Sequence, residues 1–216
     1  MRFEVRVKGI RDFEKFLETQ PATTRKAAQL AINDVVRKTY ARSKREIMRQ
    51  VNLSASYLDG RDGRDPRLKI IQFATEDDLR AVIQARRRAT SLNRFDARQM
   101  YAPAKGGGRK KAGVSVRVGN SRKNIPKAFF VKLKAGTEDG GNLGIAIRVP
   151  SSEGVTGRRF RGVPFGGSDP RNTDVYLLYG PSVQQVFDDV AVEQEGWAQD
   201  RLEAEFARQY ARLSGG

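Results

Sequence analysis

The side chains in this sequence with the clearest chemistry are the Lys and Arg residues between positions 84 and 123. That segment holds twelve basic residues and one acid, Asp96, for a local net charge of +11. Guanidinium and ammonium groups at this density bind phosphates or the acidic surface of another protein. The candidate polyanion- or partner-binding residues are Arg86, Arg87, Arg88, Arg94, Arg109, Lys110 and Lys111.

This basic segment carries no motif that would read a base sequence. It has no recognition-helix pattern, no RNP aromatic pattern and no zinc-finger spacing. Phe95 and Tyr101 lie in the segment, and their rings have the chemistry to stack on bases, although packing in a core is the commoner use of such rings. Any nucleic acid bound here would be bound without sequence preference.

Catalytic chemistry finds little support in these 216 residues. The chain contains no Cys and no His, which removes thiolate nucleophiles, the commonest general base and the commonest metal ligands. The glycines at 106–108 lack the spacing of a phosphate-binding P-loop. The acidic pairs at 77–78 and 188–189 adjoin a polar turn and a helix start, where carboxylates are common. We therefore predict a protein that is not an enzyme and uses no cofactor or metal.

Charge and hydropathy indicate how the chain is expected to contact other subunits and whether it is expected to enter a membrane. Forty-one Lys and Arg against 25 Asp and Glu give a net charge of +16, whereas residues 182–213 carry a net charge of −4. This polarity suits head-to-tail contacts between subunits, and the alternative that the acids only decorate a helix stays open. No apolar run approaches the roughly 18 residues that span a bilayer, so we expect a soluble protein with no membrane partner.

The first half of the chain predicts a strand and a short helix, a long helix, and then a β-hairpin. Residues 3–7 alternate apolar and charged side chains, and a helical stretch follows at 12–19. No Gly or Pro interrupts residues 22–51, which predicts a helix of about eight turns. Residues 52–67 are typical of turns and loop, and strands at 68–74 and 79–86 are expected to pair around an acidic turn at 76–78.

The second half predicts further strands, two loops and a last helix. Residues 102–112 are expected to form a flexible basic loop, and 150–173 a second Gly- and Arg-rich excursion. Strands are predicted around 114–118, 128–133, 143–149 and 175–179, and Gly180-Pro181-Ser182 is expected to open the last helix. The fold class is α+β: one domain over 1–216, with an antiparallel sheet packed on two long helices.

The order of several short segments resembles a known family. These segments are Gly9-Ile10, 27–33 (AAQLAIN), 51–53 (VNL), 85–88 (ARRR), 91–95 (SLNRF), 113–116 (GVSV), 125–129 (IPKAF) and 144–148 (GIAIR). In this order they resemble the prophage minor tail protein Z family, the tail-completion proteins of long-tailed bacteriophages. The resemblance runs from about residue 9 to the C-terminal helix.

The resemblance implies a structural virion protein that acts at the head-proximal end of the tail, the neck, in tail assembly and head-tail joining. It implies no catalytic residues. The expected partners are tail and neck proteins (tail terminator, tail tube and connector proteins) and further copies of this chain in a six-fold ring. It also implies location in the virion after assembly in the host cytoplasm. At the neck, a basic body could contact packaged DNA without sequence preference or an acidic neighbouring ring, and both alternatives stay open. The alternative hypothesis is a free protein that binds nucleic acid without sequence specificity.

Overall fold

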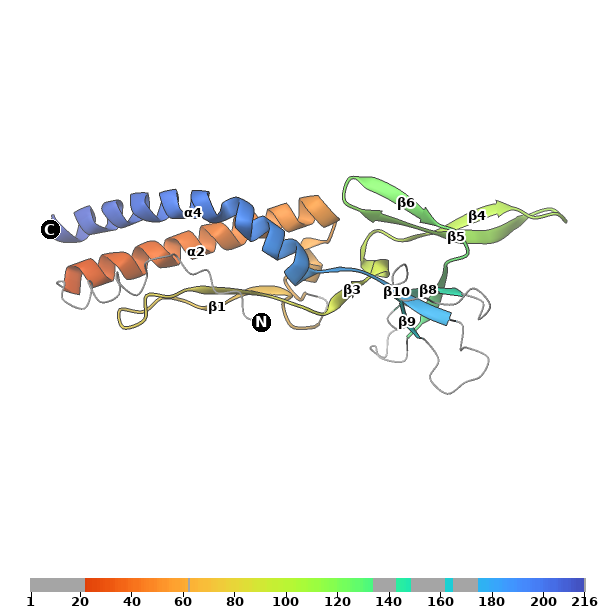
Figure 1. Cartoon of the computed structure of the whole chain (residues 1–216), viewed down its shortest axis with the longest axis horizontal. Helices are drawn as coiled ribbons and strands as arrows, with labels where there is room; N and C mark the ends of the chain where they lie inside the picture. The colour runs from red at the N-terminus through yellow and green to blue at the C-terminus, as the bar shows by residue number, and fades with distance from the viewer. Residues whose placement is uncertain (1–21, 62, 134–142, 149–161, 165–174, 216) are drawn as a thin grey trace. The chain divides into compact units, whose positions relative to one another are not determined.

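The computed structural model describes residues 22–61, 63–133, 143–148, 162–164 and 175–215 (Figure 1). The predicted strand at 3–7 and helix at 12–19 lie outside these residues. Contacts gather the chain into two compact units. Unit 1 comprises Met1–Met48, Ser54–Arg87 and Val183–Gly216, and unit 2 comprises Arg49–Leu53 and Arg88–Ser182. That the two units act as a single domain stays a prediction.

Unit 1 is built on two long helices. Helix α2 spans Ala22–Val51 and confirms the helix predicted from the absence of Gly and Pro. Helix α4 spans Val183–Ser214. The two helices lie side by side (Figure 1) and run antiparallel, because Asp34 contacts Arg208 whereas Ser43, further along α2, contacts Gln194.

A β-hairpin and a short helix complete unit 1. Strand β1 (Leu68–Gln72) pairs antiparallel with β2 (Val82–Ala85), as predicted. Within the predicted loop at 52–67 lies a single helical turn, α3 (Ala55–Leu58). The Ser54 hydroxyl caps this turn by accepting a hydrogen bond from the Tyr57 backbone N–H at 3.2 Å. Sequence periodicity misses such a short helix because one turn is too short to show a period.

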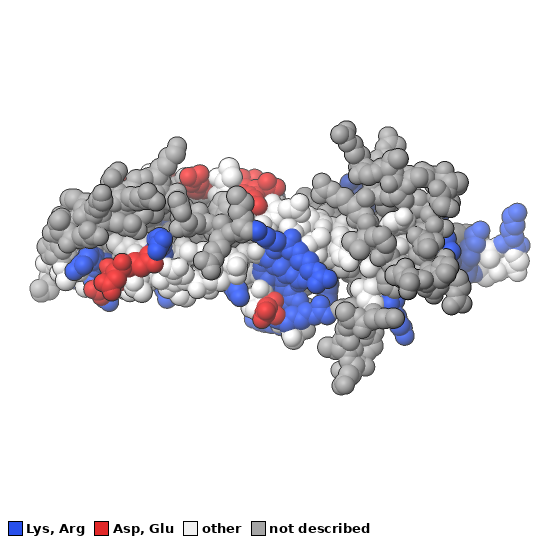
Figure 2. All heavy atoms as spheres, turned by 60° about the horizontal axis from the view of Figure 1, so that its bottom comes forward, with Lys and Arg blue, Asp and Glu red and all other residues white. Residues whose placement is uncertain are grey.

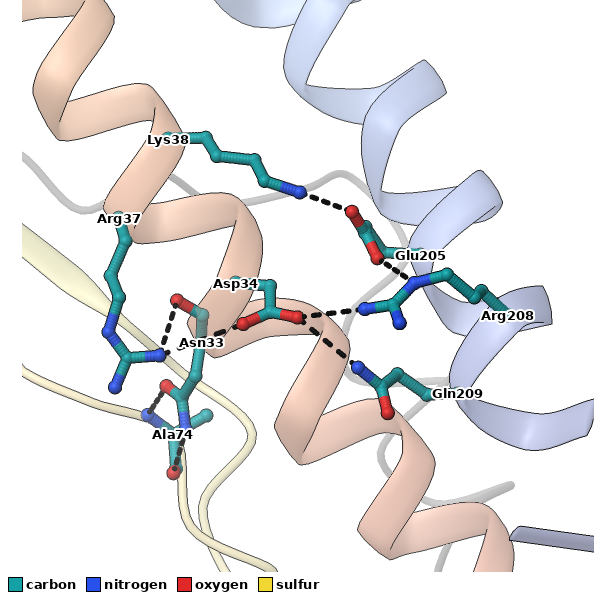
Figure 3. A network of polar contacts seen from close by, with 8 residues as sticks. All are labelled: Asn33, Asp34, Arg37, Lys38, Ala74, Glu205, Arg208 and Gln209. Atoms are coloured by element: carbon teal, nitrogen blue, oxygen red, sulfur yellow. Dashed lines mark hydrogen bonds and ion pairs between the residues drawn. The ribbon is translucent and has the colours of Figure 1, made fainter. Parts of the chain in front are cut away.

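Asn33 of α2 holds the chain that leaves β1. Its amide Nδ2 donates to the Ala74 carbonyl at 2.9 Å, and its Oδ1 accepts from the Ala74 N–H at 2.8 Å (Figure 3). One side chain therefore satisfies both backbone groups of a residue that has left the strand ladder. Nearby, Ala28 of α2 and Leu79 form a small buried cluster against Ile32 and Phe206.

Opposite charges line the contact between the two helices. Helix α2 carries eight basic residues and two acids, whereas α4 carries seven acids and three basic residues. Glu205 of α4 is only 3% exposed and accepts from Lys38 of α2 and from Arg208 at 2.7 Å (Figure 3). Arg208 reaches back to Asp34 at 3.2 Å. These contacts set the register of the helix pair.

Unit 2 contains two antiparallel sheets, and the larger one packs around a small apolar core. Its larger sheet has the order β3-β10-β8-β7, with β9 paired to β10, and every pairing is antiparallel. The strand bounds are β3 Ala89–Ser91, β7 Phe129–Lys132, β8 Leu143–Arg148, β9 Gly162–Pro164 and β10 Val175–Ser182. Ala146, Val175 and Leu177 are buried together, with Phe129 and Val131 packed against them. The predicted strands here are confirmed.

The second sheet of unit 2 corrects the predicted loop at 102–112. Strand β4 (Arg98–Pro103) pairs with β5 (Arg109–Val118), and β5 pairs with β6 (Ser121–Ile125). Only residues 104–108 remain outside the strands. The loop prediction was wrong because the exposed basic residues of β5 looked like loop, whereas their backbone groups are satisfied by the ladder with β4.

Two further predictions need correction. The strand predicted to end at 179 continues as β10 through Gly180 and Pro181 to Ser182, and the last helix begins directly after these residues, at Val183, as predicted. The pairing of β10 with β3 shifts register between Gly180 and Ser182, and this irregularity accommodates a residue that has no N–H to donate. Within the predicted excursion at 150–173, residues Gly162–Pro164 form β9, and the rest of that range lies outside the described residues.

The α+β fold class is confirmed, and the described residues form three antiparallel sheets where one was predicted. In the described part of the chain, no helix combines the length and the apolar character needed to cross a membrane.

The buried carboxylate of Glu205 generates a pH-dependent prediction. Hydrogen bonds from Lys38 and Arg208 lower the pKa of Glu205 from 4.5 to about 2. A lowered pKa contributes stability that is present above pH 4.5 and is lost as the pH falls toward about 2. We expect Glu205→Gln to reduce the free energy of unfolding at neutral pH by on the order of 2 kcal/mol.

Denaturant titrations at several pH values would measure this effect. The difference between wild type and Glu205→Gln should shrink steadily between about pH 5 and about pH 2. The matched control is Glu203→Gln, because Glu203 is exposed on the same helix and has no ion pair within the described residues. A difference that stays constant with pH would contradict the role given to the Glu205 carboxylate.

Candidate polyanion-binding hairpin

The seven predicted binding residues are divided between the two compact units. Arg86 and Arg87 belong to unit 1, and the other five belong to unit 2. The backbone of Arg86 is bonded on both sides, donating to Arg67 O at 2.8 Å and accepting from Gln184 N at 3.0 Å. Arg94 is half-buried at the end of the 3-10 helix η1 (Leu92–Arg94). Arg87, Arg88, Arg109, Lys110 and Lys111 are exposed, and the last three are consecutive residues of one strand.

These three residues lie on a two-stranded ribbon. Strand β6 pairs with β5 only from Val114 to Val118, whereas β4 pairs with β5 as far as Arg109. The chain between Tyr101 and Lys111 therefore extends past the three-stranded sheet with only two strands. We call residues 101–111 the basic ribbon. Figure 2 shows blue side chains at the end of this hairpin, at the right of the view.

A glycine and a register shift mark the base of the basic ribbon. Gly113 has φ = 126°, and a Cβ added there would lie 2.5 Å from the Ile125 carbonyl oxygen. No other residue fits this close approach between β5 and β6. The β4–β5 register shifts directly beside it, between Met100 and Tyr101. Such irregularities bend a strand pair, so the ribbon can leave the plane of the sheet here.

The turn at the end of the basic ribbon is short and open. The Ala104 N–H donates to Gly108 O at 3.2 Å, and the Gly107 N–H donates to Ala104 O at 3.1 Å. Gly107 and Gly108 have φ of 87° and 76°, which glycine adopts without strain. A Cβ at any of the three glycines would meet no atom within 4 Å. The turn therefore ends in bare backbone, with the exposed side chain of Lys105 beside it.

Below the ribbon, Asp96 is the counter-charge of a basic sheet face. Its carboxylate accepts hydrogen bonds from Arg98 at 3.2 Å and from Arg122. Arg122 also donates to Asp96 O at 2.9 Å and to the Ser115 hydroxyl at 3.2 Å. Arg117 stands directly opposite Arg122 across the β5–β6 pair, and directly opposed like charges repel. Asp96 offsets that repulsion.

The pKa of Asp96 reflects these contacts. Partial burial raises it, but the hydrogen bond from Arg98 and the positive charge of Arg122 lower it by more, so the net shift is downward. Asp96 has φ = 45°, a left-handed conformation that Asp and Asn tolerate better than most residues. The carboxylate is therefore held ionised where the chain leaves η1 and enters β4.

Acidic residues elsewhere serve the fold rather than a metal. Asp78, from the acidic pair at 77–78, accepts from Arg80 at 2.7 Å and from Gln72 at 2.8 Å, which closes the β1–β2 hairpin. Asp188 accepts from Gln184 one turn earlier in α4. Across the residues that the structure describes, no group of three or more His, Cys, Asp or Glu side chains could hold a metal ion.

The sequence prediction missed three features of this site. It grouped the basic residues by their order in the chain, and so it did not separate the paired cations around Asp96 from the unpaired ones on the ribbon. It omitted Lys105, and it gave no structural role to Gly113. The strict alternation at 114–118 was the available signal, since extending it back to Arg109 would have placed these cations on a strand.

Comparison of the chain with protein family models, with curated proteins and with solved structures found no match.

The Asp96 cluster generates a prediction about salt. Asp96→Asn keeps a residue that tolerates positive φ but removes the charge between Arg98, Arg117 and Arg122. We expect the variant to have a lower free energy of unfolding than the wild type at low salt, because the arginines then repel each other. The difference in free energy of unfolding between wild type and variant should become smaller in high salt, where exposed charges are screened.

Chemical denaturation at low and at high salt concentration would measure both effects. The pH gives an independent check: a lowered Asp96 pKa means that its contribution disappears as the pH falls below the usual carboxyl range, so wild type and variant should converge in acid. An unchanged deficit in high salt would show that packing, not charge, is what Asp96 provides.

Proposed function

We propose that this chain is a structural virion protein of a tailed phage, a minor tail or tail-completion component that acts at the neck in tail assembly and head-tail joining. The observation that carries the proposal is the basic ribbon: a projecting arm whose cations have no partner among the described residues. The order of segments that resembles the minor tail protein Z family supports the same role.

The two units suit a binding component rather than a catalyst. Unit 1 provides a stiff support, because α2 and α4 are each about 45 Å long and are joined by buried polar contacts such as Ser43 to Gln194. Unit 2 provides the ribbon, whose exposed residues are free to engage a polyanion. The proposed partners are the tail terminator, tail tube and connector proteins, with further copies of this chain in a six-fold ring.

The second candidate function is sequence-non-specific binding of nucleic acid by the free protein. The same ribbon favours it, since exposed Lys and Arg that lack acidic neighbours neutralise phosphates. The two functions differ in stoichiometry. A tail component is present in each particle at a low, fixed ratio to the tail tube protein, whereas a free DNA-binding protein coats DNA and is absent from particles.

Mass spectrometry of purified particles tests the proposed function. We expect peptides of this chain at a ratio on the order of one ring per particle, relative to the tail tube protein. Replacing Arg109, Lys110 and Lys111 by Ser should lower the yield of infectious particles while the free protein stays folded. The matched control removes three exposed cations elsewhere: Arg45→Ser, Arg64→Ser and Arg212→Ser. Absence of the chain from purified particles would overturn the proposal.

A further inference from the structure

The cations of the basic ribbon point to both of its faces. Successive residues of a strand alternate sides, so Arg109 and Lys111 share one face and Lys110 takes the other. Lys105 stands in the turn at the end. All four side chains are exposed, and none takes part in an ion pair or hydrogen bond within the described part of the chain. A partner that neutralises all four cations at once presents negative charge on both sides of the ribbon.

The rest of the ribbon adds no competing charge. The residues of β4 that pair with Lys111, Lys110 and Arg109 are Tyr101, Ala102 and Pro103. No Asp or Glu occurs between positions 97 and 137. The cations around Asp96 are already neutralised in part, whereas the four cations of the ribbon have no ion pair within the described residues. Arg117, Lys123 and Lys127 elsewhere in unit 2 are likewise exposed without an ion pair there.

Two-sided negative charge distinguishes a nucleic acid groove from an acidic protein surface. An acidic helix or sheet face would meet one side of the ribbon and leave the other cations in water. The major groove of B-form DNA is about 12 Å wide and about 8.5 Å deep, and it admits a two-stranded ribbon between two walls of phosphate. The major groove of A-form RNA is too narrow for this, and a single strand has only one row of phosphates.

The glycines at the end of the ribbon fit the same partner. Gly106 does not need a positive φ, and a Cβ there would meet nothing within 4 Å, so neither backbone conformation nor packing within the described residues requires glycine. A bare backbone allows close approach to the floor of a groove. The bend site at Gly113 and the β4–β5 register shift lets the ribbon leave the plane of its sheet.

We infer that the basic ribbon enters the major groove of duplex DNA, where Arg109 and Lys111 contact phosphates of one wall and Lys110 those of the other. No base sequence is read, because the contacts are to the backbone. This inference goes beyond the proposed function. It holds equally for a tail component that meets packaged DNA and for a free DNA-binding protein, so presence in or absence from particles does not decide it.

The salt dependence of DNA binding by the full chain tests the inference. Each phosphate contact to B-DNA adds about 0.9 to the slope of log K against log salt. For a short duplex of random sequence, we expect Arg109→Gln/Lys110→Gln/Lys111→Gln to reduce the slope by about 2 to 3 and to weaken binding at least tenfold at low salt. The matched control Arg45→Gln/Arg64→Gln/Arg212→Gln removes the same charge and should change the slope by less than about 1.

Two comparisons distinguish insertion into a groove from simple attraction to polyanions. Gly106→Leu leaves every charge in place and fills open space, so it should weaken duplex binding severalfold with no change in the slope or in the thermal midpoint of the protein. Duplex DNA glucosylated in its major groove should also bind more weakly than the same unmodified duplex. Equal binding of single-stranded DNA, duplex RNA or polyglutamate, or an equal loss of slope in both triple variants, would overturn the inference.

Discussion

The burial of Glu205 between α2 and α4 is the constraint on which unit 1 depends. A carboxylate that is 3% exposed is strongly destabilising unless cations and hydrogen bonds compensate for the lost water. Lys38, Arg201 and Arg208 provide that compensation, and of the three only Lys38 comes from α2. A shift by one turn would remove the Lys38 contact and leave the buried carboxylate with only its two partners on α4. The ion pairs therefore specify the helix pair, while the apolar contacts add most of its stability.

The same register positions the hairpin of unit 1. Asn33 and Asp34 are consecutive residues of α2 that contact different elements (Figure 3). Asp34 accepts hydrogen bonds from Arg208 and Gln209 of α4. Asn33 forms hydrogen bonds with both backbone groups of Ala74, after β1. One turn of helix thus connects the helix pair to the β-hairpin. The two-stranded β1–β2 sheet is too small to be stable alone, so its attachment to α2 is what makes it an ordered element.

The sequence predicted the elements that have a regular local pattern, and it missed those that depend on contacts between residues far apart in the chain. Helix α2 was predicted to the residue, because nothing in 22–51 interrupts it, and the β1–β2 pairing followed from apolar runs about an acidic turn. The strand from Arg109 to Ala112 was missed, because charged residues carry no hydrophobic alternation and only the ladder with β4 keeps them extended. Likewise, the contact of Asp96 with Arg122 joins residues 26 positions apart, and local periodicity contains no information about it.

The two ways in which this chain uses charge explain where its function lies. In unit 1, cations such as Lys38 and Lys44 are paired with Glu205 and Asp59, so their charge is used by the fold. In unit 2, Arg98 and Arg122 are likewise paired with Asp96, which neutralises part of their charge. On the ribbon the charge is not used by the fold: three consecutive exposed cations repel one another and have no counter-charge among the described residues. Neutral residues would stabilise that hairpin better, so its charge opposes folding slightly and is the feature on which the proposed binding of a polyanion rests.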